Sequence, residues 1–198
     1  MGNFVVSVIK FFFALALFPV TYASAVSFGH HLKTYPGAYQ DFFIWGLLIF
    51  LVIFLFLYQF WGFYEFGQSA MNGIFKFIAP VNQVIARVFP FFMLLTLLVF
   101  YCVTTFGRTN RFDHYFMFFT GFTGAMHILL TAQDRQNQEQ SPIKPNYLFL
   151  INLVAIVNIS LLVLILDVIL GKFTFNIFFG KVILILQFIY VTASQAII

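Results

Sequence analysis

A single carboxylate, Glu65, interrupts the long stretch between Asp41 and Lys76, which is otherwise uncharged. Gln68 and Asn72 follow it at helical spacing, so the three polar side chains should share one face of a helix. An ionisable group on a membrane helix is costly and often marks a ligand site or a proton-transfer site. The same stripe is also expected if Glu65 lies at the membrane surface and bonds to Gln68 or to a neighbouring helix.

His127 is the second side chain that could do chemistry. Gly124 and Thr131 flank it at helical spacing, and such small residues permit close helix contacts. Its imidazole could bind a metal or haem, relay a proton, or make one structural hydrogen bond to a facing helix. A bis-histidine haem needs a second histidine on a facing span, whereas His30-His31 is expected in a loop. We therefore expect no cofactor and no bound metal.

Asp167 falls late in one apolar segment and Lys181 falls early in the next. Two antiparallel helices joined near Gly171 would bring these side chains together as a buried ion pair. Such a pair more often stabilises a membrane protein than transports an ion, and both roles are open.

Membrane helices must position these groups. The sequence is 62% hydrophobic and 8% charged, with 32 phenylalanines in 198 residues, whereas soluble proteins average about 25% charged residues. In lipid, about 20 apolar residues cross the hydrocarbon core as a helix, which satisfies its own backbone groups. The sequence therefore predicts an all-α, polytopic transmembrane bundle of about six helices. It forms one domain over residues 1–198, with spans at about 8–27, 42–64 (continuing to 77), 88–106, 115–132, 147–170 and 174–197.

The N-terminal segment and the distribution of charge bear on processing, membrane orientation and binding partners. Lys10, the apolar run after it and Ala23-Ser24-Ala25 are typical of a signal peptide, although we expect an uncleaved first helix. The 10 Lys and Arg residues fall equally on the two sides of the predicted spans, so they leave the orientation open. The scattered net charge of +4 argues against nucleic acid as a partner. The expected partners are the lipid bilayer and other integral-membrane proteins, in the bacterial cytoplasmic membrane or, alternatively, in an organelle membrane.

The order of these features resembles small integral-membrane zinc metallopeptidases of the site-2 protease type. In that family an apolar helix runs into His-Glu-x-x-His, where two histidines bind zinc and the glutamate activates water. The corresponding segment here is Tyr64-Glu65-Phe66-Gly67-Gln68. A later span of the family resembles Gly-Phe-Thr-x-Ala-x-His, to which residues 121–127 correspond, and a helix with asparagines follows.

The departures from this family concern the metal. Tyr64 and Gln68 stand where the two zinc-binding histidines would be, and only Glu65 is retained. A phenol and an amide do not replace two imidazoles as zinc ligands. The resemblance therefore implies a relative that has kept the fold and lost the metal. Such a protein would be a non-catalytic subunit or scaffold, and it would pack against partner transmembrane helices in a larger membrane complex.

Two other functions are compatible with the sequence. The first is an ion- or proton-conducting component that uses Glu65, His127 and Asp167 along one polar path. The second is an enzyme whose metal is held by His127 and acidic residues from several helices. A lipid- or quinone-binding cavity beside Trp61 and His127 is compatible with each of these functions.

Overall fold

The structure is a computed structural model that describes residues 2–56, 60–79, 82–107, 112–139 and 144–197. These ranges are helical and contain no strand, so the predicted all-α polytopic bundle is confirmed. The elements are α1 (Gly2–Leu32), α2 (Gly37–Phe56), α3 (Trp61–Ile74), the 3-10 helix η1 (Lys76–Ile78), α4 (Asn82–Val88), α5 (Phe91–Gly107), α6 (Asp113–Gln138), α7 (Pro145–Ile169) and α8 (Phe175–Ile197).

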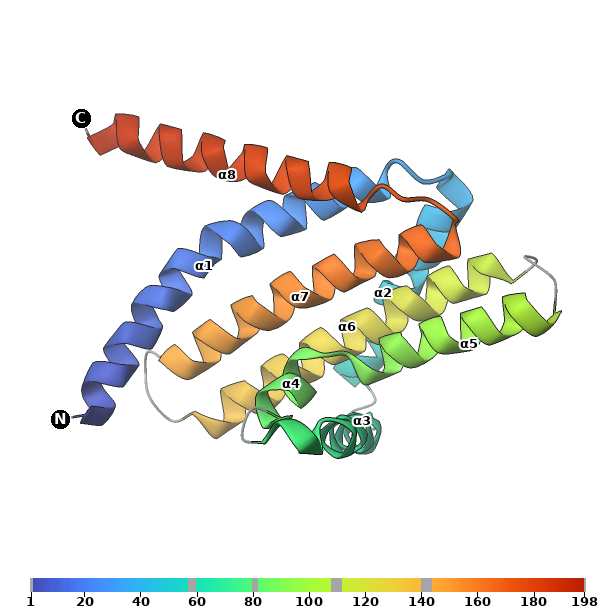
Figure 1. Ribbon diagram of the computed structural model, residues 1–198, viewed down its shortest axis with the longest axis horizontal. Coiled ribbons are helices and arrows are strands. Elements are labelled where there is room, and N and C mark those ends of the chain that lie inside the picture. The colour runs from blue at the N-terminus through green and yellow to red at the C-terminus, as the bar shows by residue number, and fades with distance from the viewer. Residues whose placement is uncertain (1, 57–59, 80–81, 108–111, 140–143, 198) are drawn as a thin grey trace.

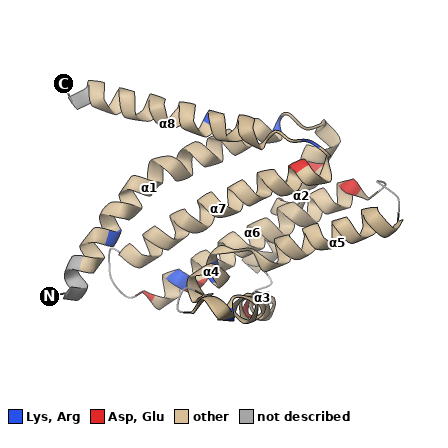
Figure 2. Cartoon of the chain, viewed as in Figure 1, with Lys and Arg blue, Asp and Glu red and all other residues tan. Residues whose placement is uncertain are grey.

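Five of these helices, α1, α2, α6, α7 and α8, are long and apolar enough to cross a membrane. Helices α4 and α5 form a sixth candidate, with a bend of 67° between them. Pro90 lies at this bend, and it cannot continue a helix because it has no backbone N–H. The start of α1 and the end of α8 lie toward the same side of the molecule (Figure 1), and most charged residues lie toward the helix ends and connections (Figure 2). This architecture is that of a multi-pass integral membrane protein.

The predicted continuation of the second span to residue 77 is wrong. Helix α2 ends at Phe56, and a separate helix, α3, begins at Trp61. Figure 1 shows α3 nearly end-on, across the direction of the long helices. Its 14 residues extend about 21 Å, which is less than the hydrocarbon core of about 30 Å. Helix α3 therefore does not cross the membrane by itself.

Helices α2 and α6 approach one another closely through two glycines. A Cβ added at Gly46 would overlap the carbonyl oxygen of Phe118, and one added at Gly121 would overlap that of Phe43. Small residues allow helix backbones in a membrane to come this close. Half of the most apolar stretch of α6 is buried, compared with 11% for α1 and for α8. The helix that carries His127 is therefore central in the bundle.

Candidate functional site

His127 lies beside a small cavity between α3, α4 and α6. Tyr64 and Gln68 of α3 line this cavity together with His127, and Ala86 of α4 contributes to its wall. Its volume is about 10 Å³, which is near the lower limit for a single water molecule. The structure thus places His127 next to the two α3 positions that the resemblance aligns with zinc ligands, but it leaves almost no space between them.

The imidazole of His127 bonds to the end of a neighbouring helix. Its Nε2 lies 3.0 Å from the backbone carbonyl oxygen of Arg87, and we assign the proton to Nε2 because a carbonyl only accepts. The amide of Asn158 donates to the next carbonyl, that of Val88, also at 3.0 Å. These carbonyls lie at the end of α4, where no further turn supplies N–H donors. Both side chains therefore satisfy backbone groups that the bend at Pro90 leaves free.

The polar residues of α3 do not face a single site. Gln68 donates a hydrogen bond to the hydroxyl of Tyr64, so these two side chains bond to one another. Glu65 is exposed, and the indole N–H of Trp61 donates to its carboxylate at 2.7 Å. Asn72 is partly buried, and its Oδ1 accepts no hydrogen bond within the described ranges. Glu65 does not line the cavity beside His127 and is not placed to activate a water there.

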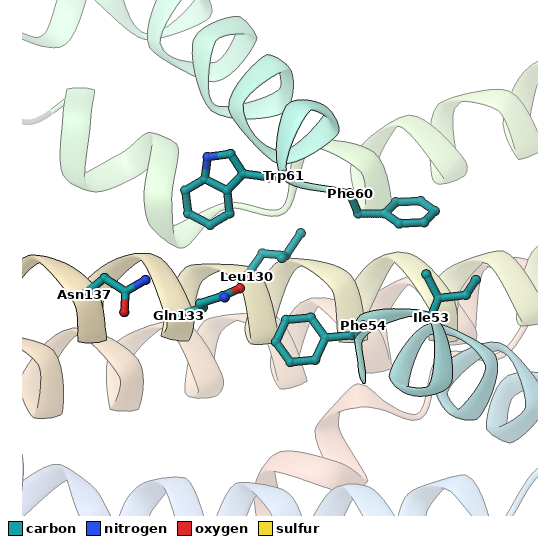
Figure 3. A pocket seen from close by; sticks show the side chains of 7 residues that line it. All are labelled: Ile53, Phe54, Phe60, Trp61, Leu130, Gln133 and Asn137. Atoms are coloured by element: carbon teal, nitrogen blue, oxygen red, sulfur yellow. The ribbon is translucent and has the colours of Figure 1, made fainter. Parts of the chain in front are cut away.

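A second cavity, of about 180 Å³, lies between the end of α2, the start of α3 and the end of α6. Figure 3 shows the indole of Trp61 over Gln133 and Asn137 of α6, with Phe54 on the α2 side. His127 does not line this cavity, so the cavity beside Trp61 and the cavity beside His127 are separate. The side-chain amides of Gln133 and Asn137 are the hydrogen-bonding groups of this cavity, because the indole N–H of Trp61 donates to Glu65.

Asp167 is buried near the end of α7 and does not pair with Lys181. Its carboxylate accepts a hydrogen bond of 2.8 Å from the hydroxyl of Tyr35. The backbone N–H and the hydroxyl of Thr174 each donate to it at 2.6 Å. Lys181 forms no ion pair with Asp167 in the part of the chain that the structure describes. The chain turns sharply at Gly171, where φ is +61°, and this turn brings Thr174 rather than Lys181 to the carboxylate.

His31 completes this buried cluster, and its placement corrects a prediction. The pair His30-His31 lies in the last turn of α1 rather than in a loop, and His31 is 1% exposed. Its Nε2 lies 2.9 Å from the hydroxyl oxygen of Tyr35 and 3.6 Å from Oδ1 of Asp167. Burial and the hydrogen bond to Asp167 raise the pKa of Tyr35 above its usual range. The phenol therefore stays protonated, and the cluster joins α1, α7 and α8.

Sequence reasoning did not identify Tyr35 and Thr174 as members of a buried cluster. Two spacings carried a weak signal: Tyr35 follows His31 by one helical turn, and Thr174 follows Asp167 across a glycine. Neither spacing indicates that the two pairs meet, because they are separated by more than 100 residues. The role of Asn158 in bonding α4 was missed for the same reason.

The three proposed conducting groups lie in different environments. Glu65 is exposed beside Trp61, His127 bonds to the end of α4, and Asp167 lies in the cluster at the α7–α8 turn. Within the described ranges, no three His, Cys, Asp or Glu side chains lie close enough together to bind a metal ion. No protein-family model matches the chain, and neither a curated protein nor a solved structure matches it. The fold and the contacts define a multi-pass membrane protein whose buried polar groups mostly bond to one another or to the backbone.

Proposed function

We propose that this protein is a non-catalytic integral-membrane subunit that binds a transmembrane helix of another membrane protein. The observation that carries the proposal is the position of Gln187. This residue lies near the middle of α8, is exposed, and makes no hydrogen bond with any other described residue. An amide at the centre of a membrane helix needs a hydrogen-bond partner, because lipid tails offer none.

The side chains around Gln187 form a continuous helix face. Ile183 and Leu184 precede it by about one turn, and Tyr190 and Val191 follow it by about one turn; all four are exposed. Apolar residues on such a face suit lipid and a partner helix equally well. The amide of Gln187 favours a partner helix over lipid, because glutamine side chains hydrogen-bond across helix pairs in membranes. The face of α8 defined by these five residues is therefore the proposed binding face.

The small cavity beside His127 supports the non-catalytic part of the proposal. Tyr64 and Gln68 bond to one another, and the imidazole of His127 is engaged with the carbonyl of Arg87. These contacts fit a relative of site-2-protease-like peptidases in which the histidine positions have become structural. Within the proposal, the bacterial cytoplasmic membrane is the expected location.

The proposal is tested by replacing the amide on α8. The full-length protein and its Gln187→Leu variant are purified in a mild detergent from their native membrane, and the bound membrane protein is identified and quantified per chain. One interhelical hydrogen bond contributes about 0.6–2 kcal/mol, so the variant should retain roughly three- to thirtyfold less partner. Gln195→Leu is the matched control, because it makes the same change near the end of α8 and should retain the partner.

Three results would contradict the proposal. The first is equal recovery of the partner with Gln187→Leu and with the wild-type chain. The second is recovery of only a second copy of this chain, detected with two differently tagged copies, because α8 would then form a homo-oligomer. The third is catalytic turnover by the purified protein alone.

A further inference from the structure

A cavity of about 500 Å³ opens where α1, α4, α6 and α7 meet. It lies where α6 ends and α7 begins, toward the start of α1 (Figure 1). Three cationic side chains from three helices line it: Lys10 of α1, Arg87 of α4 and Arg135 of α6. This cavity is distinct from those beside His127 and Trp61.

The cations of this cavity are poorly neutralised by the protein. The guanidinium of Arg87 has no hydrogen bond or ion pair to any described residue. The positive charge of Arg135 repels it, and the carboxylate of Asp134 offsets part of that repulsion. Arg135 pairs with Asp134 at 3.2 Å, but its Nε is buried and has no partner within the described ranges. The ammonium of Lys10 donates to Asn146, a neutral amide, at 2.8 Å. An anion between the two guanidinium groups would relieve their repulsion.

The one carboxylate on the wall, Glu139, is engaged elsewhere. Its oxygens accept hydrogen bonds from the backbone N–H groups of Asn146 at 3.2 Å and Tyr147 at 2.7 Å, and from the side-chain amide of Asn146 at 3.0 Å. Glu139 therefore caps the start of α7, where free N–H groups favour a negative charge. It forms no ion pair with Lys10 or Arg87 in the described part of the chain.

Apolar side chains of α4 and α7 also line this cavity. Val84 of α4 and Phe149 and Leu150 of α7 line the cavity beside the cations. A soluble anion such as phosphate would gain nothing from these side chains. A phospholipid would place its phosphate between the guanidinium groups and an acyl chain along α7.

We propose that this cavity binds the headgroup of an anionic phospholipid, with Arg87 and Arg135 as the phosphate-binding residues and Lys10 as a third cation. Guanidinium groups bind phosphate oxygens through paired N–H donors. Basic pockets between transmembrane helices bind anionic headgroups in this way, and each nearby cation contributes roughly fivefold in affinity. The excess of cations on the wall selects an anionic headgroup over a zwitterionic one.

The test measures lipid binding to the purified full-length protein after delipidation, by native mass spectrometry. The probes are phosphatidylglycerol and phosphatidylcholine with identical acyl chains, and free glycerol 3-phosphate. The wild-type protein should bind phosphatidylglycerol more tightly than phosphatidylcholine, and glycerol 3-phosphate much more weakly than either. The double variant Arg87→Gln/Arg135→Gln should lose about 25-fold in affinity for phosphatidylglycerol, from two cations at about fivefold each.

Two further variants keep the result interpretable. Lys33→Gln/Lys76→Gln also removes two positive charges, but from exposed sites that do not line the cavity, and it should retain the preference. Arg87→Lys/Arg135→Lys keeps both positive charges and should retain most of the preference for phosphatidylglycerol over phosphatidylcholine. An equal loss in the lysine-to-glutamine control would overturn the proposal, because binding would then follow net charge alone. Equally tight binding of glycerol 3-phosphate would overturn the assignment to a lipid.

Discussion

The hydroxyl of Tyr35 lies 2.8 Å from Oδ1 of Asp167, and this contact ties the turn after α1 to the end of α7. The bond is buried and its acceptor is a carboxylate, so it should contribute about 1.5–3 kcal/mol to stability. Tyr35→Phe removes the donor and leaves the ring in place. We expect this variant to lower the free energy of unfolding by that amount, measured by titration with a denaturing detergent in mixed micelles.

Tyr39→Phe is the matched control for this variant. The ring of Tyr39 stacks on that of His114, and its hydroxyl has no hydrogen bond to another described residue. Its removal should change the unfolding free energy by less than about 0.5 kcal/mol. Equal losses in the two variants would mean that Tyr35 contributes through packing and not through its bond to Asp167.

The second prediction concerns the close contact between α2 and α6 at Gly46. In Gly46→Ala the new methyl group would overlap the carbonyl oxygen of Phe118, so the two helix backbones must separate. Overpacking of this kind costs about 1–3 kcal/mol and sometimes more. We expect Gly46→Ala to lower the free energy of unfolding by that amount, measured in the same mixed micelles.

Gly180→Ala controls for the change in helix propensity. Apart from its chain neighbours and the backbone of α8 itself, no atom lies within 4 Å of a Cβ added at Gly180, so alanine should be neutral there or stabilising by up to about 1 kcal/mol. A stable Gly46→Ala protein would show that α2 and α6 separate at little cost. The close approach would then not be needed for folding.

The sequence predicted the fold class because composition and the length of the apolar segments determine it. A chain with 32 phenylalanines and few charges must form membrane helices. The break between Phe56 and Trp61 was not predicted, because neither a proline nor a glycine lies between these two residues. The bend at Pro90 did carry a local signal, although a single span from residue 88 was expected there. Local pattern thus indicates which segments are apolar more reliably than where a helix changes direction.

The candidate site was harder to predict, because a helical pattern does not say which face is inside. Glu65 and Gln68 share a face by spacing, yet Glu65 is exposed while Gln68 lies at the cavity beside His127. Asp167 was expected to contact Lys181 across a helical hairpin, but the turn supplied the nearer donor, Thr174. In both cases the surroundings of the side chain depend on tertiary packing, which cannot be read from spacing in the sequence.

Metal content tests the non-catalytic proposal directly. Tyr64 and Gln68 are poor zinc ligands, so the purified wild-type protein should hold far less than one zinc per chain after adventitious metal is removed. Tyr64→His/Gln68→His places two imidazoles one helical turn apart beside His127, which could bind through Nδ1 while its Nε2 keeps the carbonyl of Arg87. We expect this double variant to bind zinc, as measured by elemental analysis and by titration with a competing chelator.

Phe66→His/Ala70→His is the control, because it places two histidines at the same spacing on α3. Neither position lines the cavity beside His127, so the control should bind zinc more weakly. About one tightly bound zinc in the wild-type chain would contradict the non-catalytic proposal. Equal affinities in the two double variants would show that His127 takes no part.

Replacement of Glu65 distinguishes the proposed subunit function from proton conduction. The carboxylate is exposed, and its bond from Trp61 can also be accepted by the carbonyl of a glutamine. Glu65→Gln should therefore leave both the fold and the binding of the partner helix unchanged. Proton flux into liposomes that contain the purified protein should be at background level for the wild-type chain and for this variant. Flux well above background in the wild-type protein that disappears in a folded Glu65→Gln variant would favour conduction instead, because only a conducting path requires the titratable carboxylate.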